Sequence, residues 1–266
     1  MDEPGFDVAA ALADTLDFLA LQPMSSGAWA GRALSPEPGF MFGGFVLAQS
    51  VMAATHAAPA GSRLHSLHGY FLRPASTSAG SEFRVHALRD GRSFASRRVQ
   101  MLQAERPVFE LTCSFTADTD GYDYELPGVL PPRGEVCQGP GPWMCSWVGP
   151  TAAGPDGTRD STHRQWCRVA GALPADPHLH SALLAYASDW TGIGGRPLQL
   201  EGDTRGMVSL DHSVWFHRPA RVDEWLFYDV HSLVNAGGRG LLRGVLRDDD
   251  GHIVASVAQE MLLTPS

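Results

Sequence analysis

The stretch Val208-Ser209-Leu210-Asp211-His212-Ser213-Val214-Trp215-Phe216-His217-Arg218-Pro219 alternates apolar and polar residues and ends at a proline. This alternation, with its aromatic and β-branched side chains, is typical of a β-strand. The stretch has a counterpart 145 residues earlier, where residues 68–75 carry the same Phe, Arg, Pro and Ala at the same spacing. The chain therefore contains one strand sequence twice.

The same shift continues on the C-terminal side of this strand. It places Tyr228, Val230, His231 and Leu233 on Phe83, Val85, His86 and Leu88, then Arg243 on Arg98, and Ile253 and Val254 on Val108 and Phe109. A constant shift through several strands and turns predicts two duplicated domains rather than a solenoid of short repeats. A chain of 266 residues has room for two such domains of about 100–150 residues.

Each repeat is predicted to contain one helix and a run of strands. The first helix begins at Phe42-Gly43-Gly44, continues to about Ala58 and is apolar nearly all round, which predicts burial. Periodicity also predicts helices over 6–21 and 180–190, and strands over 28–34, 64–72, 82–89, 94–103, 107–115, 165–173, 207–217, 225–233, 239–247 and 253–263. A buried helix followed by an antiparallel sheet that can wrap it predicts an α+β fold of two tandem hotdog repeats.

Between the repeats, residues 119–162 are dense in glycine and proline, and helical and strand periodicity is lost. This composition predicts a linker between an N-terminal repeat over residues 1–118 and a C-terminal repeat over residues 163–266. Trp143 and Trp147 indicate that the linker lies against the body of the protein.

The composition excludes several classes of function. A net charge of −9 argues against nucleic acid or an anionic membrane surface as the main partner, and no apolar run is long enough to span a membrane. All 20 cationic side chains are arginines, which excludes chemistry that needs a lysine amine, such as a Schiff base or a Walker-type loop. The acidic N-terminus has no signal-peptide pattern, so a cytoplasmic protein is predicted.

The cysteines and histidines predict neither a metal site nor a cofactor. The four cysteines form no Cys-x-x-Cys pair, and free buried thiols are expected. His178 and His180 have no carboxylate or thiolate ligands at zinc spacing, so we expect a solvated loop there rather than a metal pair.

Comparison of the two repeats locates candidate functional residues, because duplicated halves often keep activity in one copy. Subtracting 145 pairs polar residues of the second repeat with less functional ones of the first: Asp189 with Gly44, Ser209 with Leu64, Gln259 with Ser114, and Asp211 with Ser66. The second repeat has therefore gained a carboxylate, a hydroxyl and an amide.

The chain resembles the acyl-CoA thioesterase II family, the double-hotdog hydrolases, over nearly its full length. The resemblance lies in Phe42-Gly43-Gly44, residues 65–74, residues 89–94, Ser188-Asp189, residues 210–219 and Ala258-Gln259-Glu260. It implies that an Asp, a Thr or Ser, and a Gln hold the water that attacks the thioester, and these roles fall on Asp189, Ser209 and Gln259. Many members have Thr where this chain has Ser209, so the hydroxyl is retained. The family also implies a homo-oligomer.

These side chains suit thioester hydrolysis. Asp189 can act as a general base, a role worth about 10²–10⁴-fold in rate, while Ser209 and Gln259 orient the water. Backbone amides at the start of the buried helix, near Gly43 and Gly44, are expected to bind the oxyanion, a stabilisation worth about 3–4 kcal/mol.

Other residues near these positions have supporting predicted roles. Asp211 lies two residues from Ser209 on the same strand face, and we expect it to support the substrate site rather than to act as a base. The odd offset between Ser209 and His212 places their side chains on opposite faces, which argues against a nucleophilic Ser–His pair.

Three arginines are candidates for contact with the phosphates of coenzyme A. Arg92 and Arg97, with Arg98, follow one another closely in the first repeat and offset the acidic net charge locally. The alternative is that they form a salt-bridged face of the sheet.

Three alternative functions stay open from the sequence. The same chemistry suits thioesters of an acyl carrier protein. A protein that binds acyl thioesters without hydrolysis is also open, because the glycine-rich Gly192–Gly195 directly follows Asp189 and can displace it. A hydratase ranks lower, since it needs an Asp–His dyad and no His follows Asp189 at suitable spacing.

Overall fold

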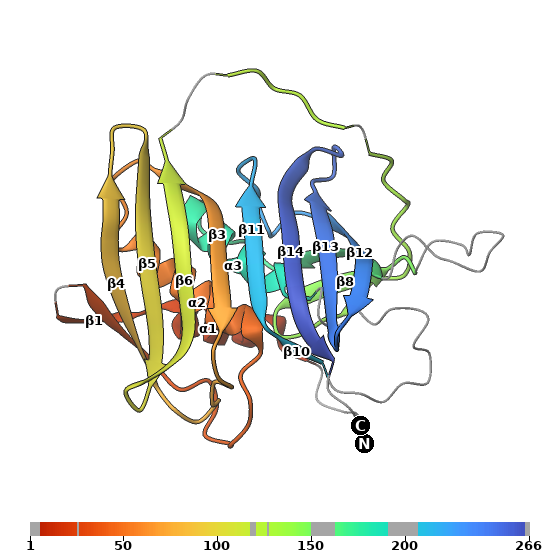
Figure 1. Ribbon diagram of the computed structural model, residues 1–266. Helices are drawn as coiled ribbons and strands as arrows, with labels where there is room; N and C mark the ends of the chain where they lie inside the picture. Colours follow the sequence, from red (N-terminus) through yellow and green to blue (C-terminus); the bar gives the residue numbers. More distant parts are fainter. Residues whose placement is uncertain are drawn as a thin grey trace.

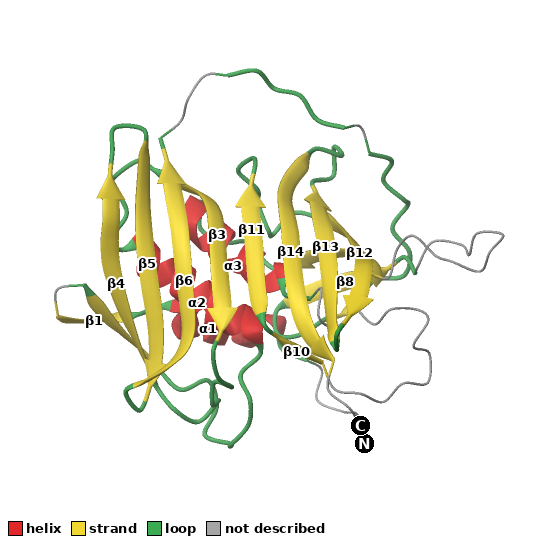
Figure 2. Cartoon of the chain, viewed as in Figure 1, coloured by secondary structure: helices red, strands yellow, loops and turns green. Residues whose placement is uncertain are grey.

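The computed structural model describes residues 6–25, 27–117, 121–126, 128–149, 163–190 and 207–263. In these residues one antiparallel sheet of 14 strands curves around three helices (Figures 1 and 2). The strand order is β1-β2-β4-β5-β6-β3-β11-β14-β13-β12-β9-β8-β7, and β10 pairs with β14. The helices lie behind the sheet in both views, so the sheet has one covered face and one open face.

The elements follow the predicted repeat. The first repeat consists of α1 (Val8–Leu19), β1 (Gln22–Ser25), β2 (Ala28–Gly31), α2 (Gly43–Thr55), β3 (Arg63–Phe71), β4 (Ser81–Asp90), β5 (Phe94–Gln103) and β6 (Arg106–Thr116). The remaining elements are β7 (Cys137–Gln138), β8 (Trp143–Trp147), β9 (His163–Val169), α3 (Pro177–Ser188), β10 (Met207–Ser209), β11 (Asp211–Phe216), β12 (Leu226–Ala236), β13 (Arg239–Arg247) and β14 (Ile253–Leu263).

Local signals set where the helices begin. Asp7 and Asp176 cap α1 and α3 by accepting hydrogen bonds from backbone N–H groups of the first turn, and Pro177 occupies the first turn of α3. The N-cap of α2 is Phe42, which makes no side-chain cap hydrogen bond. The first N–H groups of α2 are therefore available to another part of the chain.

The two repeats join through β3 and β11, which pair at the centre of the sheet with His68 opposite Ser213. Alternating side chains of these strands, such as Leu67 and Val214, point inward and are fully buried. α2 and α3 pack against each other on this inner face. No helix among the described residues is long and apolar enough to span a membrane.

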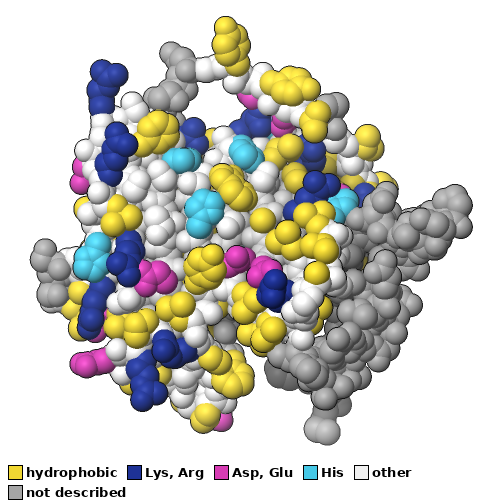
Figure 3. Space-filling model, in the orientation of Figure 1, with side chains coloured by type: hydrophobic (Ala, Val, Ile, Leu, Met, Phe, Trp, Pro, Cys, Tyr) yellow, Lys and Arg dark blue, Asp and Glu magenta, His cyan; other side chains and the backbone are white. Residues whose placement is uncertain are grey.

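The open face of the sheet is mixed in character, as Figure 3 shows. Exposed aromatic side chains such as Tyr70 and Trp215 stand on the central strands, and dark blue arginines gather on the side where β4 and β5 lie. The apolar core is therefore confined to the helical side of the sheet.

The predicted helices and strands of both repeats are confirmed, with ends that differ by a few residues. Residues predicted as a linker include two short strands, β7 and β8, which extend the sheet from β9. Trp143 is buried there as expected, whereas Trp147 is about half exposed. The expected loop at His178 and His180 is wrong, because both residues lie in α3 and His180 is buried.

The four cysteines are free, as predicted, but only two of them are buried as expected. Cys113 and Cys167 are buried, Cys145 is half-buried and Cys137 is exposed. β7 and β8 form an edge of the sheet, which explains why their thiols are more open than those of the inner strands.

The constant shift of 145 is correct from β3, β4 and β5 to β11, β12 and β13, and wrong for β14 and the helices. His68 pairs with Thr112 and Ser213 with Ala258, so β14 follows β6 at a shift of 146, because the β13–β14 turn is one residue longer. The counterpart of Gln259 is therefore Cys113, not Ser114. The two helices start 134 residues apart, and α2 is one residue longer, so their C-caps, His56 and Asp189, are 133 residues apart. Neither shift pairs Asp189 with Gly44.

Candidate active site

Asp189 lies where the end of one helix meets the start of the other. It is the C-cap residue of α3, and its side chain accepts a hydrogen bond from the backbone N–H of Gly44 in the first turn of α2. A Cβ on Gly43 would come within 2.6 Å of Asp189 Oδ2, and a Cβ on Gly44 within 2.6 Å of the Tyr186 carbonyl. The two glycines are therefore required for the close approach of these helix ends.

Gln259 connects Asp189 to a second polar residue. This glutamine is fully buried on β14, and its Nε2 lies 2.8 Å from Asp189 Oδ1 and 2.8 Å from Ser209 Oγ. One side-chain amide thus donates to a carboxylate from α3 and to a hydroxyl from β10. The three residues predicted to act together, Asp189, Ser209 and Gln259, form one cluster.

A β-bulge at Leu210 shapes the strand that carries Ser209. Ser209 pairs with Met261, whereas Ser213 pairs with Ala258, so the register against β14 changes by one residue between β10 and β11. The bulge breaks the alternation of side chains, and His212 turns inward and is fully buried. The prediction that Ser209 and His212 face opposite sides is therefore wrong.

Asp211 directly follows the bulge and is the first residue of β11. Its Oδ1 accepts the backbone N–H of Glu260 at 2.8 Å. It does not reach the pocket that contains Asp189 and Ser209. The side chain of Asp211 thus binds the backbone of β14 opposite the bulge.

His212 lies beside Asp189, although strand alternation predicts that it faces away from Ser209. Its Nε2 lies 2.7 Å from Ser188 Oγ, which itself donates to the Ala185 carbonyl, so Nε2 carries the imidazole hydrogen. Its Nδ1 faces Asp189 Oδ1 at 3.8 Å. Burial lowers the pKa of His212 to about 4, so this approach is not an ion pair at neutral pH. In the sequence, the adjacent Asp211-His212 within the repeated strand is the feature that could indicate a functional role for His212.

The environment of Asp189 sets its protonation near neutral pH. Burial raises the pKa of Asp189 to about 7, and the hydrogen bonds from Gln259 and from the Gly44 N–H oppose that rise. A carboxylate at a helix C-terminus is also disfavoured by the helix dipole, by about 0.3–1 kcal/mol. Because burial and the helix dipole both disfavour an ionised Asp189, capping of α3 alone does not explain an aspartate at this position. The result is a carboxyl group that can gain and lose a proton near neutral pH.

A pocket of about 570 Å³ opens onto this cluster. Asp189, Ser209 and Gly43 line it, and most of its remaining wall is apolar: Phe42, Val46, Phe71, Leu72, Val108 and Met261. An apolar pocket with a few convergent polar groups and a carboxyl of raised pKa is the usual form of a small-molecule site. The arrangement can bind an apolar chain and hold a water beside its reactive end.

The structure does not bring the other predicted residues to this pocket. Arg97 is buried, and its guanidinium contacts the carbonyls of Ala57 and Arg89 and the carboxylate of Asp90. Arg98 pairs with Glu110, as in the salt-bridged alternative. Arg92 is exposed in the β4–β5 turn, before β5 begins, whereas the pocket lies near the end of β5. Residues Gly192–Gly195 lie outside the described residues.

Two family models match the chain, one on each repeat. The model described as the acyl-CoA thioesterase N-terminal domain matches residues 34–116, and the model described as the acyl-CoA thioesterase C-terminal domain matches residues 126–263.

Relatives of known name match over most of the chain. Acyl-CoA thioesterase 2 of Haemophilus influenzae is 30% identical over 87% of this chain and 91% of its own length. Acyl-coenzyme A thioesterase 8 of Homo sapiens is 28% identical over 97% of this chain and 90% of its own length.

Solved structures share the fold. An acyl-CoA thioesterase II of Mycobacterium marinum is 33% identical and has a TM-score of 0.82, covering 95% of this chain and 98% of that one. A hotdog-fold protein of Alicyclobacillus acidocaldarius, 19% identical, has a TM-score of 0.76 over 95% of this chain and 98% of that one. The predicted double hotdog is confirmed.

Proposed function

Because this chain belongs to the acyl-CoA thioesterase II family, a family of thioester hydrolases, we propose that it hydrolyses acyl-CoA to a free acid and coenzyme A with Asp189, Ser209 and Gln259 as the catalytic residues. The observation that carries the proposal is the single amide of Gln259, which joins the Asp189 carboxylate to the Ser209 hydroxyl at the wall of an apolar pocket.

Asp189 is the general base in this mechanism. A carboxyl group with a pKa of about 7 is half ionised at neutral pH and accepts a proton from water more readily than an ordinary aspartate. Its water lies in the pocket beside the carboxylate and attacks the thioester carbonyl carbon. The proton goes to Asp189, which returns it to the sulfur of coenzyme A when the tetrahedral intermediate collapses.

Ser209 and Gln259 position the water in different ways. Gln259 Nε2 donates to Asp189 and to Ser209, so the Ser209 hydroxyl accepts that bond and keeps its own hydrogen for the substrate or the water. Gln259 does not line the pocket, so it acts through its hydrogen bonds to Asp189 and Ser209. The glutamine thus fixes the two groups that touch the water.

The start of α2 contributes to the oxyanion site. The N–H of Gly44 donates to the Asp189 carboxylate and holds the base. The N–H of Gly43, at the first position of α2, has no intrahelical partner, and Gly43 lines the pocket. We assign the oxyanion to Gly43, at the positive end of the helix dipole.

Thiol release from acyl-CoAs of short to long chain, with wild type beside Asp189→Asn, tests this proposal. We expect release by the wild type and a loss of at least about 10²-fold in kcat for the variant, with the fold retained. Near-normal turnover by Asp189→Asn would rule out Asp189 as the base.

The same assay tests the other candidate functions. Release from acyl carrier protein thioesters alone would change the carrier and keep the chemistry. Binding of acyl-CoA without thiol release would favour a non-hydrolytic binding protein. A cytoplasmic location and a homo-oligomer stay predictions, which cell fractionation and light scattering can check.

A further inference from the structure

Arg73 and Arg218 occupy the same position in the Phe-x-Arg-Pro-Ala motif of the two repeats. The backbone N–H of Arg73 donates to the Val108 carbonyl, and its Nη1 lies 2.7 Å from the Pro107 carbonyl. Arg218 makes the corresponding pair of contacts, with the carbonyls of the residues at a shift of 146: Val254 and Ile253, the latter at 3.0 Å. The two arginines are therefore held in the same way.

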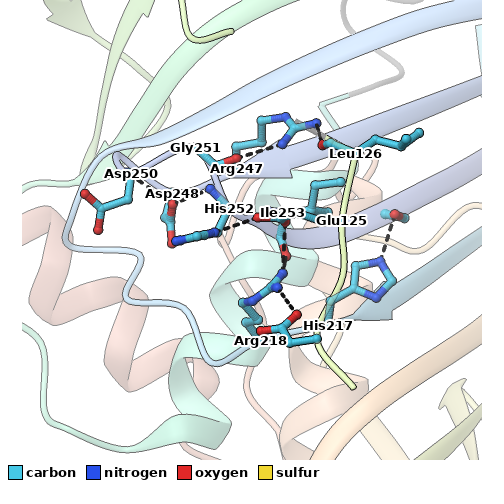
Figure 4. A network of polar contacts seen from close by, with 12 residues as sticks. Glu125, Leu126, His217, Arg218, Arg247, Asp248, Asp250, Gly251, His252 and Ile253 are labelled. Carbon is cyan, nitrogen blue, oxygen red and sulfur yellow. Dashed lines mark hydrogen bonds and ion pairs between the residues drawn. The ribbon is translucent and has the colours of Figure 1, made fainter. Parts of the chain in front are cut away.

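Arg218 binds a carboxylate that the chain itself supplies (Figure 4). Glu125 Oε2 lies 3.0 Å from Arg218 Nη1 and accepts the Ile253 N–H at 2.8 Å, while its Oε1 lies 2.6 Å from His252 Nδ1. The hydrogen bond from His252 is the largest cause that lowers the pKa of Glu125 to about 2. Asp123 also contacts Arg218. This position of the repeat therefore binds carboxylate oxygens.

Arg73 has the same setting without such a carboxylate. Among the described residues, no Asp or Glu lies within ion-pair distance of Arg73 or Arg106. Arg106 stands where the second repeat has His252, so each repeat has an arginine at the first of these positions and a basic side chain at the second. Arg73 is exposed and lines the pocket that contains Asp189 and Ser209, which Glu125 does not reach.

We infer that Arg73, with Arg106 at the position that matches His252, binds an anionic group of the substrate as Arg218 binds Glu125. The inference rests on the proposed function, because it takes the ligand of this pocket to be an acyl thioester. Pro107 has no N–H to match that of Ile253, so the recognition in the first repeat is by the guanidinium groups, whose fork geometry suits carboxylate and phosphate alike.

Two parts of the substrate carry this chemistry, the phosphates of coenzyme A and a second carboxylate on the acyl chain. Arg73→Gln, assayed with one acyl group on coenzyme A and on N-acetylcysteamine, tests the phosphates. Loss of the charged contact is expected to lower kcat/KM about tenfold for the CoA thioester and to leave the N-acetylcysteamine thioester unchanged. Pentanoyl-CoA beside glutaryl-CoA tests the acyl carboxylate in the same way. If neither ratio changes in Arg73→Gln, the inference is wrong.

Three further variants serve as controls for the Arg73→Gln measurement. Arg73→Lys keeps a positive charge and is expected to restore most of the discrimination. Arg106→Gln, at an exposed position without a described contact, gives a second reading if Arg73→Gln fails to fold. Arg218→Gln is the matched control in the other repeat, and it is expected to free Glu125 while leaving both substrate ratios at the wild-type values.

Binding separates this inference from the proposed hydrolysis. An S-alkyl-CoA thioether, which cannot be hydrolysed, is titrated calorimetrically into wild type and Arg73→Gln. About tenfold weaker binding by the variant would support the anion site even if the wild type released no thiol. Equal binding of the thioether would exclude the phosphates as the bound group. If the glutaryl-CoA to pentanoyl-CoA ratio were also unchanged while both proteins hydrolysed acyl-CoA normally, the anion site would be overturned and the proposed function would stay intact.

Discussion

The pocket that contains Asp189 has a counterpart in the other half of the molecule. A cavity of about 210 Å³ lies across the β3–β11 centre, beside the start of α3. Four of its lining residues, Phe216, Arg218, Pro219 and Ala220, are the counterparts of Phe71, Arg73, Pro74 and Ala75, which line the larger pocket. Pro177 and His180 likewise stand where α2 has Gly43 and Val46.

The difference between the two pockets lies in three side chains. Leu64 stands at the position of Ser209, Cys113 at that of Gln259, and His56 at that of Asp189. Leu64 and Cys113 are buried apolar groups that need no hydrogen-bond partner. Each hotdog repeat thus forms a pocket, and in the part of the chain that the structure describes the cluster of Asp189, Ser209 and Gln259 lies beside one of the two.

Replacing Gln259 should weaken the proposed chemistry while the Asp189 carboxyl group itself is retained. Gln259→Leu keeps the volume in the core and deletes the donor that joins Asp189 to Ser209. Leaving those buried acceptors unsatisfied costs about 1–3 kcal/mol, so we expect kcat to fall about 10- to 100-fold in a steady-state thiol-release assay.

The counterpart Cys113→Ala is the matched control for Gln259→Leu. It changes the buried residue at the same position of the other repeat, and we expect kcat to stay within about twofold of wild type while the melting temperature drops slightly. An equal loss of kcat in both variants would mean that the effect comes from core packing rather than from the polar cluster.

The pH dependence should distinguish the two C-cap residues. Asp189 must be ionised to act as a base, so kcat/KM is expected to fall about tenfold per pH unit below its pKa of about 7. Burial lowers the pKa of His56, the C-cap of α2, which does not line the pocket of Asp189. A flat profile between about pH 5.5 and 8 would contradict a titrating base.

Stability should change with pH in the opposite direction. Because the folded state raises the pKa of Asp189, its protonated form stabilises the fold at low pH, and this contribution is lost as pH rises through about 7. Each pKa unit is worth about 1.4 kcal/mol. Asp189→Asn, which cannot ionise, should therefore melt at a higher temperature relative to wild type at pH 8 than at pH 5, as calorimetry can measure.

Much of this site could be predicted from the sequence, because strand periodicity and the repeated motif are local signals. The residues Asp189, Ser209 and Gln259 were found by a subtraction that is wrong for two of them, since the helices and β14 follow other shifts. The wrong shifts still singled out these residues because each pairing changes the chemical type: Gln259 meets Ser114 or Cys113, and Asp189 meets Gly44 or His56. A comparison of residue types between the repeats can therefore indicate the same candidate residues even when the alignment is wrong by one residue or more.

The wrong predictions have separate physical causes. One extra residue at Leu210 reverses which side chains face inward, and the sequence around His212 carries no mark of it. The Gly44 N–H was expected to bind an oxyanion, but it donates to Asp189, 145 residues away, which only the packing of α2 on α3 determines. β7 and β8 are too short for periodicity to detect.

The smallest expected effect concerns the two hairpin turns that differ in length between the halves. In the β5–β6 turn Ala104 and Glu105 adopt φ of 47° and 60°, which L-residues disfavour, whereas the β13–β14 turn places Gly251 at φ 93°. A left-handed conformation costs about 1–2 kcal/mol for most L-residues, and glycine loses about 0.4–1 kcal/mol through the entropy of the unfolded chain. Glu105→Gly should therefore stabilise the fold by about 0.5 kcal/mol, or about 1–2 °C in melting temperature. Gly251→Ala should shift the melting temperature downward, because it places a Cβ where the second repeat avoids one. If both variants shifted it in the same direction, turn conformation would not be what distinguishes the two hairpins.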